Sequence, residues 1–202
     1  EPSVNRPAIK IMGILNVTPD SFSDGGSFYS FDLAVAQAEK LIADGADIID
    51  IGGESTRPFA KPVSLDNELQ RTIPIIEAIR RRHSIPISID TVKAEVARRA
   101  LAAGADIIND ISALRHDPDM LDVVQNSAAA VIVMHMQGTP ADMQVNPVYD
   151  DVVGDLLDFF QERIDWLTAN GVDRKRLILD PGIGFGKTVD HNLSILKHLS
   201  RF

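Results

Sequence analysis

Six polar residues each follow an apolar run of the kind that forms a buried strand. They are Asn16, Asp50, Asp90, Asn109, His135 and Asp180. If the strands are parallel, their carboxyl ends meet at one face of the sheet, so we expect these side chains to converge on one mouth. Carboxylates and amides without many basic groups suit a neutral, nitrogen-rich heterocycle, because Asp accepts paired N–H donors and Asn both donates and accepts. Any one of these residues taken alone is typical of a helix cap or a turn.

A polar loop follows the first of these strands, within the segment Gly13–Gly26, GILNVTPDSFSDGG. The segment starts as a strand, Val17 is still apolar, and the loop itself begins at Thr18. Phe22 is the single aromatic residue of this loop. A polar loop with one aromatic residue, directly after a buried strand, indicates an active-site lid; an ordinary surface connection is the alternative.

A second loop, LDPGIGFGKT at Leu179–Thr188, imitates a phosphate-binding P-loop. The spacing excludes that interpretation, because the first glycine of the P-loop pattern would fall on Pro181, which has no N–H to offer a phosphate. The dinucleotide-binding pattern would need glycine where Lys187 stands. The loop instead suits the close approach of a flat ring to the backbone, with Phe185 positioned to stack on that ring.

The histidine spacing does not indicate a metal site, and the absence of cysteine excludes disulfides and thiolate nucleophiles. Four histidines fall on expected helix ends or surfaces. They are His83, His116, His191 and His198. His135 is different because it stands at a strand end, where it either orients a loop or a bound ring or makes local structural hydrogen bonds.

Apolar periodicity predicts six strands that alternate with six helices. The expected strands are 9–15, 47–51, 85–89, 105–108, 129–134 and 177–179, and the expected helices are 31–44, 65–83, 92–103, 120–125, 148–169 and 193–199. Strict alternation favours parallel strands covered by helices, because each parallel crossover needs a covering helix. Two architectures satisfy this pattern, the eight-fold barrel and the open doubly wound sheet.

An internal repeat favours the barrel. Asp44–Asp50 (DGADIID) and Ala103–Asn109 (AGADIIN) share spacing and chemistry two strand-helix units apart, as a barrel built from repeated units would give. The predicted fold is therefore an α/β TIM (β/α)8 barrel, with six of its eight strand-helix units present and residues 1–202 forming a single domain.

The composition is that of an ordinary soluble domain, with 45% hydrophobic and 24% charged residues. A net charge of -9 argues against a nucleic-acid or anionic-membrane partner, because phosphate-bearing surfaces are bound by clustered Lys and Arg. No apolar run approaches the ~18 residues of a membrane span, and no signal segment opens the chain. We therefore expect a cytoplasmic protein.

Taken in order, these motifs resemble those of the dihydropteroate synthase family, the folate-pathway enzymes that sulfonamides inhibit. GILNVTPDSFSDGG resembles the family's first signature and GGESTRP its second, and SIDT, NDIS, MHMQG and LDPGIGFGK follow in the family's order. The resemblance implies a TIM-barrel transferase, a homodimer, that condenses 6-hydroxymethyl-7,8-dihydropterin diphosphate with p-aminobenzoate with the help of Mg2+. The later motifs are shared with pterin-binding methyltransferase domains, which pass a methyl group from methyltetrahydrofolate to a corrinoid and are the alternative.

The resemblance also assigns residues by position. The implied pterin pocket comprises Asp90, Asn109, Ile111, Met134, Asp180, Gly184 and Phe185. Among them, Asp90, Asn109 and Asp180 would be the catalytic residues. Asn16 would bind the diphosphate and its Mg2+. The resemblance implies that Thr56 and Arg57 lie near the diphosphate and the aminobenzoate. It also implies that Phe22 and Pro58 close over the aromatic amine.

Two features depart from the family's pattern. Phe59 follows Arg57 and Pro58 where members commonly have glycine, so this loop differs from the family's at the expected aminobenzoate contacts. The family's seventh strand carries a Ser-Arg-Lys motif and its eighth an Arg-x-His, and neither precedes Phe202. We therefore expect these residues to be part of a longer chain, with unpaired sheet edges at strands one and six, and on their own to bind pterin weakly without turnover.

Overall fold

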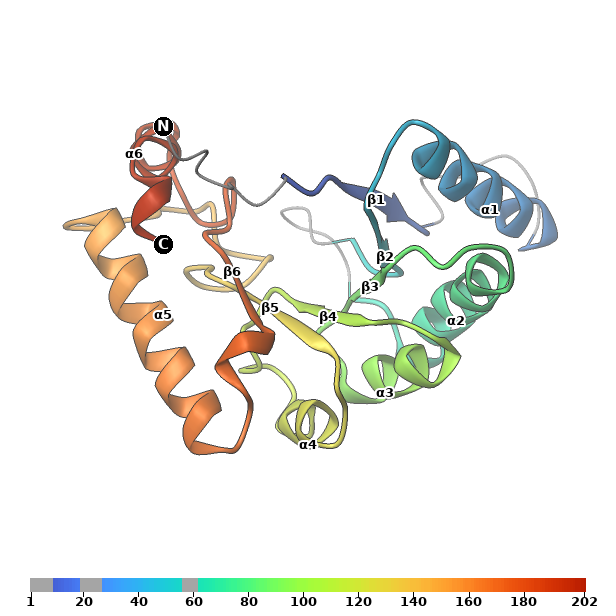
Figure 1. The fold of residues 1–202 in the computed structure, drawn as a ribbon. Helices are drawn as coiled ribbons and strands as arrows, with labels where there is room; N and C mark the ends of the chain where they lie inside the picture. The colour runs from blue at the N-terminus through green and yellow to red at the C-terminus, as the bar shows by residue number, and fades with distance from the viewer. Residues whose placement is uncertain (1–8, 19–26, 56–61) are drawn as a thin grey trace, which may run out of the picture.

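The computed structural model describes residues 9–18, 27–55 and 62–202, and within them six strands alternate with six α-helices (Figure 1). The strands are β1 (Met12–Asn16), β2 (Ile48–Gly52), β3 (Ile87–Asp90), β4 (Ile107–Asp110), β5 (Ala130–Met134) and β6 (Leu177–Asp180). The helices are α1 (Ser27–Ala43), α2 (Leu65–Arg82), α3 (Ala94–Ala103), α4 (Met120–Gln125), α5 (Val152–Ala169) and α6 (Val189–Lys197). The described residues also form the short 3-10 helices η2 (Arg174–Arg176) and η3 (Leu199–Arg201).

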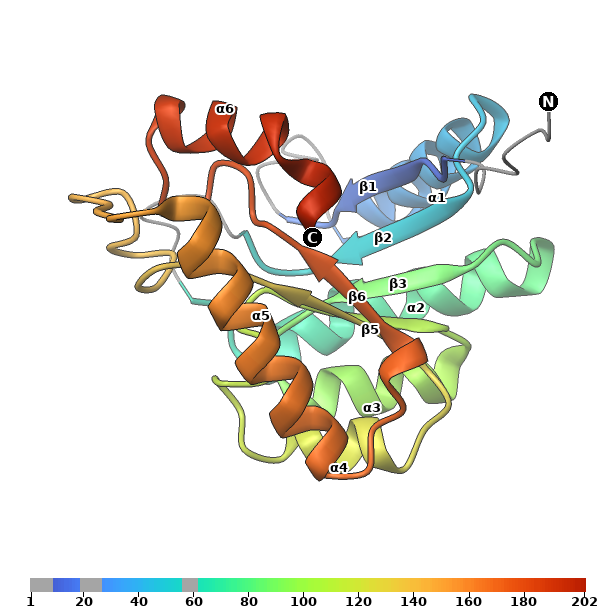
Figure 2. The same ribbon diagram turned by 60° about the vertical axis from the view of Figure 1, so that its left-hand side comes forward.

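The six strands form one sheet whose order follows the chain, and every neighbouring pair is parallel. The sheet curves, and the described helices cover its outer side (Figures 1 and 2). An open doubly wound sheet would reverse its strand order and carry helices on both faces. The architecture is therefore that of the (β/α)8 barrel, as predicted, with β1 and β6 as the edges of the described sheet.

Successive residues of each strand face two different environments. Ile49 and Ile51 of β2 and Ile89 of β3 are fully buried in the main apolar core, which they form together with the helices. Asp50 and Ser88 occupy alternate positions and therefore point to the inner face of the sheet. The outer face thus holds the fold together with apolar residues, while the inner face carries polar groups such as Asp50 and Ser88 next to apolar ones such as Ile14 and Ile107.

The repeated Gly-Ala-Asp-Ile-Ile segments have the same structural role in both places. The backbone N–H of Ile11 donates to Oδ2 of Asp47 (2.9 Å), and that of Ile87 donates to Oδ2 of Asp106 (2.9 Å). Each carboxylate also forms an ion pair with a nearby basic side chain. The repeat therefore secures the amino ends of β1 and β3 from the neighbouring strand.

The largest differences from the predicted elements lie at helix starts. α6 begins at Val189 rather than at Leu193 because the side chains of Thr188 and His191 each accept the other residue's backbone N–H, at 3.2 Å in both directions. This reciprocal capping fixes the first turn although Val189 is 74% exposed, so apolar spacing could not reveal it. In the described ranges we find no helix with both the length and the apolar character that a membrane span requires.

Candidate active site at the carboxyl ends of the strands

The carboxyl ends of the first four strands place four residues in one row of the sheet. Asn16 is in register with Gly52, Gly52 with Asp90, and Asp90 with Asn109. Residues of one row point to the same face. Gly52 has no side chain, and a Cβ there would lie 3.4 Å from Oδ2 of Asp90 and 3.6 Å from Oδ1 of Asn16. The glycine therefore leaves space between two oxygen atoms that can bind a ligand.

Asp50 lies one layer below this row on the same face. The side-chain amide of Asn109 donates to its carboxylate, with Nδ2 at 3.2 Å from Oδ2 and 3.4 Å from Oδ1. Burial raises the pKa of Asp50, and the nearby charge of Asp180 raises it further. Oδ1 of Asn109 is buried and has no hydrogen-bond partner in the described part of the chain. A ligand N–H would satisfy this acceptor.

Asp90 lies among several other carboxylates. Burial raises its pKa well above the ordinary value of 3.8, and the charges of Asp50, Glu68 and Asp110 raise it further. A carboxyl group whose charged form is disfavoured in the free site gains most from a ligand that brings positive charge or N–H donors. Perturbed carboxyl groups of this kind are typical of functional sites.

Asp180 ends β6 and begins a glycine-rich turn. Its Oδ1 accepts the N–H of Gly182 at 2.8 Å. Gly182 has a φ of +64°, and a Cβ there would lie 2.1 Å from the carbonyl oxygen of His135, so only glycine fits. Nζ of Lys187 donates to the carbonyl oxygens of His135 (3.1 Å), Gly182 (2.9 Å) and Phe185 (2.8 Å). Lys187 therefore fixes the shape of this loop. This role agrees with the sequence prediction that the loop is not a P-loop.

Three of the expected apolar contacts come together beside the row. Ile111, Met134 and Phe185 belong to one cluster with Met136 and Met143. The cluster is separate from the main core under the helices. An apolar wall next to a few convergent polar groups is the usual composition of a small-molecule site.

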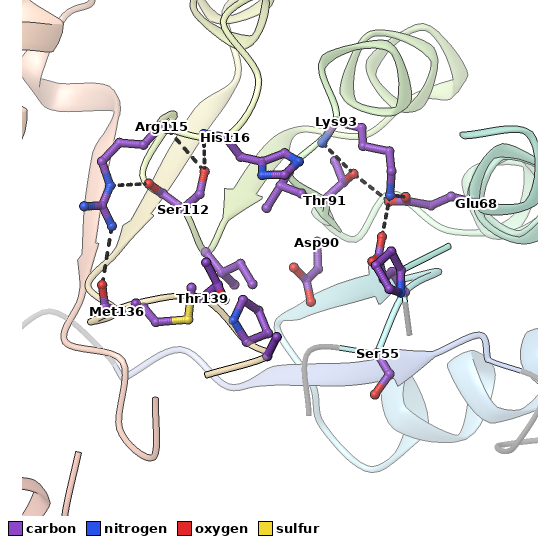
Figure 3. Close-up of a pocket in the computed structure, with 17 residues that line it drawn as sticks. Ser55, Glu68, Asp90, Thr91, Lys93, Ser112, Arg115, His116, Met136 and Thr139 are labelled. Atoms are coloured by element: carbon purple, nitrogen blue, oxygen red, sulfur yellow. Dashed lines mark hydrogen bonds and ion pairs between the residues drawn. The ribbon is translucent and has the colours of Figure 1, made fainter. Parts of the chain in front are cut away.

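A pocket of about 470 Å³ adjoins the row (Figure 3). Asp90 and Ile111 line it, together with Glu68 and Lys93. Its volume is in the range of small-molecule sites. The lining does not include five of the expected pterin contacts, which are Asn109, Met134, Asp180, Gly184 and Phe185. The expected residues are thus divided between this pocket, the inner face of the sheet and the loop that follows β6.

His135 does not join the other strand-end residues, and the expectation that all six converge is wrong for it. The ring packs edge-on against Phe159 of α5, with 4.8 Å between the ring centroids. Burial lowers the pKa of His135 to about 3. Met134, the residue before it, points to the site instead, because side chains alternate along the strand. The neutral imidazole therefore belongs to the packing between β5 and α5.

Four expected binding residues lie outside the described residues, as does most of the expected lid. They are Phe22, Thr56, Arg57 and Pro58. Asn16 is described and exposed. Its amide oxygen and a carboxylate oxygen of Asp90 flank Gly52, and oxygen donors of this type suit Mg2+ when substrate phosphates complete its coordination. The described residues contain no group of three or more His, Cys, Asp or Glu side chains arranged for a metal ion, so Mg2+ fits only if a substrate supplies ligands.

Sequence reasoning missed buried charged residues beside the site. Glu68 at the start of α2 and Asp110 at the end of β4 are fully buried, and Lys93 stands just before α3. Asp110 accepts the N–H and the hydroxyl of Ser112 at 2.7 and 2.6 Å, and burial raises its pKa even so. The Asp-x-Ser spacing was a usable signal of this turn. Glu68 offered none, because it looks like an ordinary helix-surface charge.

The fold and the site together define a (β/α)-barrel protein with a candidate small-molecule site at the carboxyl ends of its strands. A family described as pterin binding enzyme matches residues 12–202. A Synechocystis dihydropteroate synthase is 52% identical over 94% of the chain. The structure of Xanthomonas albilineans dihydropteroate synthase with 4-aminobenzoic acid is 49% identical, with a TM-score of 0.89 over 98% of this chain and 69% of that one. That of the Yersinia pestis enzyme in a sulfonamide drug complex is 47% identical, with a TM-score of 0.89 over 95% and 70%.

The chain belongs to the pterin-binding enzyme family and, within it, to the dihydropteroate synthases. It spans 65% of the length of the Synechocystis protein. The resemblance of the motifs is thereby confirmed at the level of the family.

Proposed function

We propose that this protein catalyses the dihydropteroate synthase reaction, in which 6-hydroxymethyl-7,8-dihydropterin diphosphate and p-aminobenzoate give 7,8-dihydropteroate and diphosphate. The observation that carries the proposal is the row Asn16, Gly52, Asp90 and Asn109, with Asp180 at the end of β6. Its acceptors suit the N–H groups of a pterin ring. The relatives at about half identity are synthases, which supports this function over the methyltransferase alternative.

The pterin ring is held by acceptors and by an apolar wall. Asp180 accepts the paired N–H donors of the amidine-like edge of the ring, and Oδ1 of Asn109 accepts a further N–H. Asp50 orients the amide of Asn109 from below, because it accepts both hydrogen bonds of Nδ2. The cluster of Ile111, Met134 and Phe185 covers a face of the ring, and Gly184 lets the backbone of that loop come close.

The reaction breaks the C–O bond to diphosphate and forms a C–N bond to the amine of p-aminobenzoate, which then loses a proton. No protein nucleophile is needed if the ring nitrogen shares the positive charge that develops on the exocyclic carbon. Asp90 stabilises that charge as a carboxylate beside the ring. Bound Mg2+ would neutralise the leaving diphosphate, and Asn16 would hold it through its amide oxygen.

The remaining assignments rest on the resemblance. Thr56 and Arg57 contact the diphosphate and the carboxylate end of p-aminobenzoate, and Phe22 and Pro58 close over the aromatic amine. Sulfonamides compete with p-aminobenzoate, as the drug complex of the Yersinia pestis relative suggests. The working protein is a cytoplasmic homodimer with neither a nucleic-acid nor a membrane partner.

A direct assay tests the proposal. Full-length protein is mixed with both substrates and Mg2+, and the release of diphosphate and the formation of dihydropteroate are followed together. We expect the two products in equal amounts and none with Asp180→Ala. Full-length folded protein that forms no dihydropteroate under these conditions would overturn the proposal, and methyl transfer from methyltetrahydrofolate would replace it with the alternative.

A further inference from the structure

Gly184, an expected pterin contact in the loop between β6 and α6, has both of its backbone polar groups bound by side chains. Nε2 of Gln144 donates to the carbonyl oxygen of Gly184 at 2.6 Å, and the N–H of Gly184 donates to Oδ1 of Asn192 at 2.9 Å. Gly184 is exposed, and apart from its chain neighbours no described atom would lie within 4 Å of a Cβ there. Hydrogen bonds rather than packing therefore hold this residue.

The two side chains that hold Gly184 come from different parts of the fold. Asn192 belongs to α6, which directly continues the loop, whereas Gln144 lies 40 positions earlier in the connection between β5 and α5. Met143, the residue before Gln144, is buried in the apolar cluster against which Phe185 packs. The Met143–Gln144 segment thus contacts the expected pterin wall twice, once through an apolar side chain and once through a hydrogen bond.

The rest of the β5–α5 connection keeps its shape through bonds that do not involve Gln144. Oδ1 of Asp142 accepts the N–H and the hydroxyl of Thr139 at 2.6 and 2.7 Å. The side chain of Gln137 donates to the carbonyl oxygen of Val148 at 3.0 Å and accepts its N–H at 3.2 Å. Thr139 also lines the pocket (Figure 3). Loss of the Gln144 amide would therefore release Gly184 without removing the bonds that shape this connection.

We propose that Gln144 is a positioning residue for the pterin ring: its hydrogen bond holds Gly184, and with it Phe185, in the place where the ring binds. The proposal rests on the proposed function for the identity of that ring. A loop that is already in place does not have to be ordered by its ligand, so binding costs less conformational entropy. The effect should fall on pterin affinity rather than on the chemical step, which the proposed function assigns to other residues.

The test uses full-length protein at pH 8. Gln144→Met keeps the length of the side chain but has no donor, and we expect it to raise the KM for the pterin diphosphate roughly fivefold to tenfold with kcat nearly unchanged. Gln144→His, mostly neutral at this pH and able to donate from Nε2 at a similar reach, should restore most of the affinity. Gln125→Met is the matched control, because Gln125 donates to the carbonyl oxygen of Asn170 at the same 2.6 Å in the connections that precede β5 and β6.

The split between KM and kcat separates positioning from stability. A substitution that only destabilises the protein lowers the amount of active enzyme, and hence the apparent kcat, and leaves the KM unchanged. We expect that pattern, if any loss at all, for Gln125→Met. An unchanged KM for the pterin diphosphate in Gln144→Met, or a raised KM that Gln144→His does not lower, would overturn the proposal.

Amide exchange tests the same contact independently of activity. Exchange at Gly184 and Phe185 should be faster in Gln144→Met than in wild-type protein and unchanged in Gln125→Met. If wild-type full-length protein neither binds the pterin diphosphate nor forms product, the proposed function fails instead. Exchange at these two residues then still decides whether Gln144 positions the loop, and wild-type rates in Gln144→Met would show that it does not.

Discussion

Asp47 and Asp106 lie at the amino ends of the strands, and Asp50 and Asp90 lie at the carboxyl ends of the same sheet. The first pair accepts backbone N–H groups and pairs with Lys10 and Arg80. The hydrogen bond from Ile11 and the neighbouring Lys10 lower the pKa of Asp47. At the other end, burial and neighbouring carboxylates raise the pKa values of Asp50 and Asp90. Aspartate thus stabilises the fold at the amino ends of the strands, whereas at the carboxyl ends the folded protein disfavours its charged form.

The two ends of the sheet differ in where the partners of each carboxylate come from. At the amino ends each charge is placed where its partners already exist in the chain. At the carboxyl ends, carboxylates lie close to one another, and although Asn109 donates to Asp50, the pKa values of Asp50 and Asp90 remain raised, so a ligand that brings N–H donors or positive charge would relieve them. A site of this kind is kept for function at the expense of stability. Substitutions at either end of the strands can test this comparison.

The largest effect is expected for Asp90→Asn. In full-length protein, turnover should fall by roughly two orders of magnitude, because the amide cannot stabilise the developing positive charge. The free energy of unfolding should rise in the same variant, because a half-buried carboxylate among other carboxylates is removed. Enzyme kinetics and urea unfolding on one preparation check both signs. A variant that is less stable than wild type would break the comparison at this end.

At the opposite end, Asp106→Ala should lower the free energy of unfolding by about 1 to 3 kcal/mol, because the buried N–H of Ile87 loses its acceptor. Pterin binding should be unchanged, since Asp106 lies at the far end of the barrel. Asp106→Asn, which keeps an acceptor, is the control and should recover part of the loss. Urea denaturation measures the difference, and impaired pterin binding in a folded Asp106→Ala protein would contradict it.

The pH dependence sharpens the contrast. A carboxyl group whose folded-state pKa is raised above 3.8 binds more protons in the folded state, so its penalty is full at high pH and vanishes as pH falls to about 4. The stability advantage of Asp90→Asn over wild type should therefore be largest at neutral pH and shrink on acidification. Unfolding midpoints measured from pH 7 to pH 4 check this, and an advantage that grows on acidification would contradict the raised pKa.

The smallest effect is expected for Asp47→Asn. The amide oxygen can still accept the N–H of Ile11, so only the exposed ion pair with Lys10 is lost. Because the pKa of Asp47 is lowered, its contribution is present at neutral pH and is lost as pH falls below about 3.8. The two proteins should therefore differ slightly at neutral pH and low salt, and converge in acid or at high salt. A difference that persists in high salt would indicate a contact other than the ion pair.

Much of this arrangement could be predicted from the sequence, because it depends on local signals. Apolar runs that end in Asn16, Asp90, Asn109 and Asp180 located the mouth, and the repeated Gly-Ala-Asp-Ile-Ile segment favoured the barrel. Both signals are reliable because the register of the strands follows from the alternation of side chains along a strand and from the repetition of strand-helix units.

The rest depends on which side a residue faces and on contacts far apart in the chain. His135 has the same sequence context as the other strand-end residues but faces α5. The pairing of Lys93 with Glu54 and Glu68 joins residues 39 and 25 positions apart, and no spacing rule predicts it. The reciprocal cap of Thr188 and His191 required an exposed first turn, which apolar periodicity does not detect.

The most direct test of the account is calorimetric titration of 6-hydroxymethyl-7,8-dihydropterin diphosphate, with Mg2+, into full-length wild-type protein, Asp180→Ala and Asp106→Ala. We expect Asp180→Ala to lose measurable binding because paired ring N–H donors are left without an acceptor, and Asp106→Ala to bind like wild type although it is less stable than wild type. Wild-type affinity in Asp180→Ala, or lost affinity in folded Asp106→Ala, would contradict the placement of the pterin site at the carboxyl ends of the strands.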